Sequence, residues 1–184
     1  MRLKSQSVVL STLLLVVACD DSTTPGPIPT SGTIIIDSRV RDNRVGGFSF
    51  ARATIIFSPN AESLLPDIGV MVQINEQGSI IGTFLAPSDF PRPTFCMLKQ
   101  YSTIDSAQAY FQAVAEIPET SYVDLAIPVN IGQVWAVRTR DNKHAKILIR
   151  NERTGIDSSS STERTLWGEV EFQWAFQPNG TRQF

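Results

Sequence analysis

The chain has few of the side chains on which most catalytic and metal sites depend. Its 184 residues include one histidine, His144, two cysteines and three methionines. A single histidine excludes any metal site built from several histidines. The sequence also has no glycine-rich phosphate loop and no Gly-x-Ser-x-Gly nucleophile motif. We therefore expect a protein that is not an enzyme and has no catalytic residues and no metal ligands.

Cysteine is too scarce for a disulfide framework. If Cys19 carries a lipid, as argued below, Cys96 has no partner for an intrachain disulfide. Cys96 stands among apolar residues, which is typical of a buried, unreactive thiol. Stability must then come from the hydrophobic core.

An excess of positive charge is absent as well. The formal net charge is −2, and loss of Arg2 and Lys4 with a signal peptide would make it −4. Binding to nucleic acid requires basic surface that neutralises phosphates, so we expect no nucleic-acid partner. With 42% hydrophobic and 18% charged residues, the chain has the composition of a folded globular domain.

The N-terminus carries a secretion signal. Two basic residues lie within residues 1–4, residues 8–18 are apolar except for Ser11 and Thr12, and Cys19 follows directly. The apolar run is shorter than the roughly 20 residues of a spanning helix. The pattern resembles a bacterial lipoprotein signal peptide, in which the cysteine is acylated after cleavage. This implies a signal peptide at residues 1–18, lipidation of Cys19, and a lipid anchor (palmitate among its acyl groups) to the outer membrane, on its surface or periplasmic face.

The remainder divides into a tether and one domain. Residues 19–32 contain three prolines and two glycines among small polar residues, which predicts a flexible linker. Residues 33–184 have the length of a single globular domain.

Short apolar runs that alternate with turn residues predict a mainly β domain, a single antiparallel meander or sandwich with one short helix. We expect strands at residues 33–36, 48–57, 68–75, 79–85, 133–140, 144–150 and 166–177. The last is the most regular, because Gly168, Val170, Phe172, Trp174 and Phe176 alternate with polar residues. Residues 153–164 are rich in serine and predict a loop.

The helix is expected at residues 104–115, where apolar residues recur at helical spacing. Asp105 or Ser106 is expected to cap its start, and Pro118 to end it.

Two residues are weak candidates for ligand binding. Trp167 falls on the polar face of the last strand, where it is either a stacking platform for a flat ligand or covered by the serine-rich loop. His144 follows a turn between lysines, where it is either a surface imidazole or a ligand-binding group. Glu169 and Glu171 share that same polar face, so we interpret them as solvated rather than as a catalytic pair.

Three segments resemble HmuY-like bacterial lipoproteins. They are residues 46–50, with a Gly-Phe-x-Phe pattern; residues 134–149, with a turn before Lys-x-Ala-Lys; and residues 168–182, which end in Gln-Pro-Asn-Gly-Thr-Arg. The resemblance implies a predominantly β surface lipoprotein, with haem capture in the best-known members. Haem there is held by side chains on the iron, often two histidines, whereas this chain has only His144.

The leading hypothesis is therefore a lipid-anchored binding protein that scavenges haem or another small ligand, with an outer-membrane receptor as a candidate partner. The alternative is a structural or adhesive surface lipoprotein without a small ligand. A pocket with convergent polar groups favours the first hypothesis, and an exposed apolar patch over a filled interior favours the second.

Overall fold

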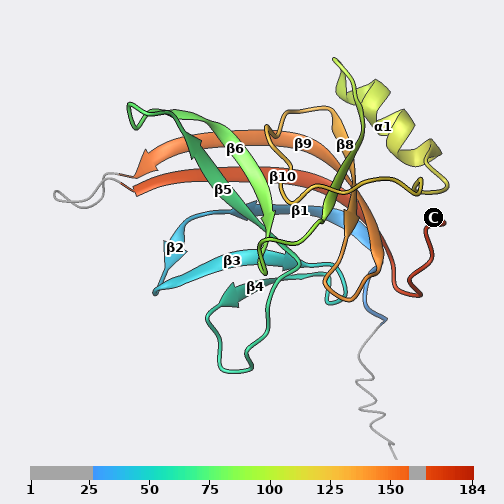
Figure 1. Ribbon diagram of the computed structural model, residues 1–184, viewed down its shortest axis with the longest axis horizontal. Helices are drawn as coiled ribbons and strands as arrows, with labels where there is room; N and C mark the ends of the chain where they lie inside the picture. The colour runs from blue at the N-terminus through green and yellow to red at the C-terminus, as the bar shows by residue number, and fades with distance from the viewer. Residues whose placement is uncertain (1–26, 158–164) are drawn as a thin grey trace, which may run out of the picture.

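A computed structural model describes residues 27–157 and 165–184 and shows two antiparallel β-sheets packed face to face (Figure 1). Sheet I has the strand order β1-β10-β9-β8-β7, and sheet II has the order β2-β3-β5-β6 with β4 paired to β3. The strands are β1 (Ser31–Asp37), β2 (Val40–Arg41), β3 (Arg44–Ser49), β4 (Thr54–Ser58), β5 (Ile68–Ile74), β6 (Ile80–Pro87), β7 (Phe95–Gln100), β8 (Gln133–Arg138), β9 (His144–Asp157) and β10 (Thr165–Gln177). The mainly β, single-domain architecture with one short helix is thus confirmed.

The C-terminal strand forms the centre of the core, as its alternation predicts. The side chains of Val170, Phe172, Trp174 and Phe176 are buried between the sheets. Trp174 packs against two rings of sheet II, with centroid distances of 5.1 Å to Phe48 and 6.1 Å to Phe50. Aromatic contacts between the two layers therefore hold the sheets together.

The helix α1 (Ile104–Ala113) packs on the outer face of sheet I, beside β8 and the C-terminus (Figure 1). Its Ala107 and Phe111 contact Val134 and Leu148, which point away from the core. Thr103, rather than Asp105 or Ser106, caps the helix, because its hydroxyl accepts the Ser106 N–H. The helix ends at Ala113, well before Pro118.

Residues 48–57 do not form the single strand that the sequence predicts. The segment is a hairpin of β3 and β4, with a turn in which the Ala53 N–H bonds to the Phe50 carbonyl. Ala53 adopts a φ of +51°, which is uncommon for a residue other than glycine. Because an alanine stands at this position, the sequence contains no glycine that would indicate the turn. The expected turn at residues 75–78 is present and joins β5 to β6.

Four further features of the fold differ from the expectation. β1 begins at Ser31, inside the range assigned to the linker. β9 continues to Asp157, so the first residues of the predicted serine-rich loop are strand, and residues 158–164 lie outside the described part of the chain. Cys96 is half-buried rather than buried, because it alternates with Phe95 along β7 and lies on the outer face of sheet I. β7 itself was not predicted.

Within residues 27–157 and 165–184, no helix has the length and hydrophobicity needed to span a membrane.

Candidate functional site

The candidate site begins with a cross-strand pair at the end of sheet I. Arg138, the last residue of β8, lies opposite His144, the first residue of β9, across the turn at residues 139–143. Both side chains fall on the outer face of the sheet, because the alternate residues Val137 and Ala145 belong to the core. The hairpin therefore places a guanidinium and an imidazole side by side.

Tyr122 comes from the connection between α1 and β8. The connection is held in place at the following residue, Val123, which exchanges two backbone hydrogen bonds with Phe95, of 2.8 and 2.9 Å. The guanidinium carbon of Arg138 lies 4.9 Å from the centre of the Tyr122 ring. The ring thus supports the arginine through a cation–π contact.

Arg182 is held in place by the docked C-terminal segment. Its carbonyl accepts the Ile117 N–H at 2.9 Å, and the Phe184 N–H donates to the Ala115 carbonyl at 2.7 Å. The buried Lys146 donates to the Val114 carbonyl at 2.6 Å and lies about equally far from the Phe111 and Phe184 rings. Removal from water lowers the pKa of Lys146. These contacts hold the end of α1 and the C-terminal segment beside the site.

Together these elements enclose a pocket of about 330 Å³. Its walls are formed by Pro118, Glu119, Thr120, Tyr122, Arg138, His144 and Arg182. We call this the His144 pocket. Its lining is mainly polar and includes two arginines, which distinguishes it from the interior of the sandwich.

Two polar atoms of the pocket residues are removed from solvent without a hydrogen-bond partner in the described part of the chain. They are Nδ1 of His144 and the hydroxyl oxygen of Tyr122. Buried polar atoms are nearly always paired, because an unpaired one costs about 1–3 kcal/mol. Both atoms belong to residues that line the same pocket.

The charges around the pocket favour a neutral imidazole. Burial lowers the pKa of His144, and the positive charges of Arg182 and Arg138 lower it further. Burial raises the pKa of the Tyr122 hydroxyl, so this group remains protonated. Near neutral pH the site therefore presents a neutral histidine and a tyrosine hydroxyl beside the side chains of two arginines and Glu119.

Trp167, the other candidate, lies at the opposite end of β10. It pairs with Gly155, whereas His144 pairs with Gln177, so the structure does not bring Trp167 and His144 together. The Arg39 guanidinium stacks 3.5 Å from the centre of the indole ring. Gly155 leaves room for the ring, since a Cβ there would lie only 2.5 Å from it. One face of Trp167 is thus already occupied by an arginine.

The polar residues near Trp167 form ion pairs with one another. Glu169 contacts Arg39 at 3.4 Å and also Arg153, and Asp37 contacts Arg41 at 2.7 Å. These carboxylates are half-buried beneath the arginines rather than freely solvated. Paired carboxylates and arginines therefore cover the outer face of sheet I at this end.

A second hollow, of about 260 Å³, lies on sheet II where β3 and β5 separate. Its lining is mainly apolar and includes three glycines. Val45, Leu65 and Met71 around it are more than a third exposed. No unpaired buried polar side-chain atom is found among its described lining residues.

The residues present do not fit a haem group. His144 and Tyr122 are side chains of types that bind haem iron, but the pocket walls carry two arginines and a glutamate where a porphyrin needs apolar faces. Met71 and Met97 do not line this pocket. Among the residues that the structure describes, no group of three or more His, Cys, Asp or Glu side chains could hold a metal ion.

Sequence reasoning found His144 but missed its neighbours. Arg138 could have been inferred, because residues equally spaced about a tight turn face each other in a hairpin. Tyr122 and Arg182 belong to segments that are distant from His144 in the sequence, and no local sequence pattern indicates that they line the same pocket. Cys19, the predicted lipidation site, lies outside the described residues.

Comparisons of the chain with protein-family models, with curated proteins and with solved structures gave no match.

Proposed function

We propose that this protein is a non-enzymatic binding protein of the bacterial cell envelope, anchored by lipid on Cys19, that takes a small ligand into the His144 pocket. The N-terminal signal supports the location, and residues 19–32 would tether the domain to the membrane. The resemblance to HmuY-like lipoproteins supports a binding role rather than a catalytic one.

One observation carries the proposal: His144 and Tyr122, which line the same pocket, each hold a polar side-chain atom that has no hydrogen-bond partner in the described part of the chain. The volume of about 330 Å³ falls within the range of small-molecule sites, roughly 300–1,000 Å³. A ligand that forms hydrogen bonds with both atoms would remove the free-energy cost of leaving them unpaired. A purely structural surface has no need for this arrangement.

The family resemblance would make haem the ligand, but the polar walls of the pocket favour a smaller and more hydrophilic molecule. We therefore propose scavenging of a small polar ligand and retain haem only as a compound to be tested. An outer-membrane receptor that accepts the ligand is the partner that such a role would require.

The test is a thermal unfolding series on the full chain, extracted from membranes in detergent. The probes are succinate, inorganic phosphate, glucose and haem. A ligand at 100 times its Kd adds about 2.7 kcal/mol, which corresponds to a rise of about 5–10 °C in Tm. The Tyr122→Phe variant should lose most of that rise, whereas the matched Tyr101→Phe variant, outside the pocket, should keep it. If no probe shifts the Tm of the wild-type protein, the binding role is contradicted.

The adhesive alternative rests on a different observation. Met71 is 49% exposed beside the apolar hollow of sheet II, together with Val45 and Leu65. Exposed apolar patches of this kind mark protein contacts. A photoreactive group at position 71 should yield a discrete crosslinked partner on intact cells if this alternative holds. A matched label at position 52, outside this hollow, should yield none.

A further inference from the structure

We infer that the His144 pocket binds a small organic anion, whose carboxylate or phosphate group lies between Arg138 and Arg182. This inference rests on the proposed binding function and specifies the chemistry of its ligand. Two features of the pocket support it, namely the hydrogen-bond donors of its lining residues and the way its charges are balanced.

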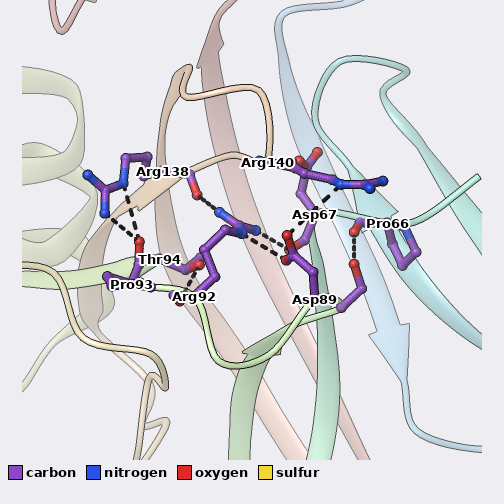
Figure 2. A network of polar contacts seen from close by, with 9 residues as sticks. Pro66, Asp67, Asp89, Arg92, Pro93, Thr94, Arg138 and Arg140 are labelled. Atoms are coloured by element: carbon purple, nitrogen blue, oxygen red, sulfur yellow. Dashed lines mark hydrogen bonds and ion pairs between the residues drawn. The ribbon is translucent and has the colours of Figure 1, made fainter.

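Arg138 is fixed in orientation but not saturated. Its Nε and Nη2 donate to the Pro93 carbonyl at 3.2 and 2.9 Å, as Figure 2 shows, and the Tyr122 ring supports its plane. Its third nitrogen, Nη1, has no acceptor among the residues described. A guanidinium held by its other nitrogens loses little conformational entropy when it binds an anion.

Among the described residues, Arg182 forms ion pairs with two exposed carboxylates. It lies 3.4 Å from Glu116 and 3.5 Å from Glu119, whose side chains are 54% and 92% exposed. Exposed pairs of this kind contribute at most about 1 kcal/mol. The Glu119 carboxylate is therefore bound only weakly to Arg182. An anionic ligand can displace it and pair with Arg182 instead.

The remaining groups complete a set of donors. The Tyr122 hydroxyl can donate, and Nδ1 of His144 can donate in the tautomer that carries its hydrogen there. Two guanidinium groups, a hydroxyl and an imidazole N–H match the acceptor oxygens of a carboxylate or phosphate. A neutral ligand would leave the charge of Arg138 without a counter-ion, since no acidic side chain contacts it in the described residues.

The experiment is isothermal titration calorimetry of the full chain in detergent. The probes are succinate, inorganic phosphate and succinamide, which is the neutral analogue of succinate. We expect one-site binding of succinate or phosphate and at least tenfold weaker binding of succinamide. The tighter of the two anions identifies the charged group of the ligand.

Three variants place the anion in the pocket. Arg182→Gln should weaken anion binding at least tenfold, and Glu119→Gln should strengthen it because the competing carboxylate is removed. The control is Arg44→Gln, since Arg44 forms a similarly loose pair with Asp42 at 3.6 Å and lies away from the pocket. This variant should bind like the wild type. Circular dichroism and Tm of each variant verify that it is folded.

The outcomes separate this inference from the proposed function. If succinamide binds in a Tyr122-dependent manner and neither anion does, the pocket is a ligand site of another chemistry and the inference is overturned alone. If anions bind equally well to Arg182→Gln, the inference is overturned as well. If no probe binds at all, both the inference and the small-ligand function fail.

Discussion

The carboxylate of Asp67 accepts the backbone N–H of Arg140 at 3.1 Å, and so joins the start of β5 in sheet II to the turn that follows β8 in sheet I (Figure 2). Its other oxygen accepts the Phe50 N–H at 2.9 Å. Arg92 adds a second tie, donating to the Arg138 carbonyl at 2.6 Å and to the Asp67 carbonyl at 3.3 Å. This network therefore fixes the backbone of Arg138, on which the His144 pocket depends.

Asp67→Ala should destabilise the fold strongly. Asp67 is 7% exposed, and loss of its carboxylate leaves the buried Phe50 N–H without an acceptor, at a cost of about 1–3 kcal/mol, and also removes the acceptor of the partly buried Arg140 N–H. Urea denaturation followed by circular dichroism measures the change. The control is Glu62→Ala, an exposed carboxylate whose removal should cost less than about 0.5 kcal/mol. Equal stability of the two variants would contradict a role for Asp67 in joining the sheets.

Trp174→Ala should lower the free energy of unfolding by about 3–5 kcal/mol, because a 3% exposed indole is removed from the aromatic core. Trp167→Ala, on the same strand but on the other face, should cost clearly less. Chemical denaturation midpoints of both variants provide the measurement. A wild-type midpoint for Trp174→Ala would show that the aromatic contacts between the sheets are not stabilising.

The sequence was sufficient for elements whose burial repeats with a simple period. Phe172, Trp174 and Phe176 alternate with polar residues, and Ala107 and Phe111 lie one turn apart, so both the strand and the helical face were predicted correctly. The hairpin around Ala53 was missed because an apolar run hides a turn that lacks glycine and proline. Its conformation is imposed by packing rather than by local preference.

The candidate site could be predicted only in part. His144 stands out as the one histidine, and its partner Arg138 follows from the turn between them. Arg182 and Tyr122 reach the pocket because the C-terminal segment and the α1–β8 connection dock on sheet I. That docking depends on nonlocal contacts such as Lys146 with Val114, which no sequence period reveals.

Cys19→Ser should release the protein from membranes. The cysteine follows an apolar run and Ala18, the position of acylation in lipoprotein signals, and serine offers no thiol for that modification. Cell fractionation and immunoblotting measure the distribution. Cys96→Ser is the matched control and should remain with the membranes. Membrane retention of the Cys19→Ser protein at the wild-type level would contradict the lipid anchor.

A haem titration followed by absorbance should show weak binding or none, without the spectrum of two axial histidines. The chain has a single histidine, and the His144 pocket offers a porphyrin charged walls. The same titration with His144→Ala provides the comparison. Tight stoichiometric binding that this substitution abolishes would establish His144 as an axial ligand and reverse our interpretation of the pocket.

Anion binding should strengthen as the pH falls through the range in which His144 titrates. In the free protein, burial together with Arg182 and Arg138 holds the pKa of His144 below its ordinary value of 6.5. The groups that face it from the packed elements are Arg138 on β8, Arg182 on the C-terminal segment, and Tyr122 and Glu119 on the α1–β8 connection.

An anion between the two arginines offsets their repulsion and raises the pKa of His144 in the complex. The complex then binds more protons than the free protein, so affinity increases as the pH falls through the pKa of His144 in the complex and levels off below the lowered pKa of the free protein. We expect a gain of about twofold to tenfold, since one pKa unit corresponds to tenfold. His144→Asn should lose this gain, and comparing the two proteins with the same anion cancels the titration of the anion itself. A pH dependence that persists unchanged in His144→Asn would show that the proton is taken up elsewhere.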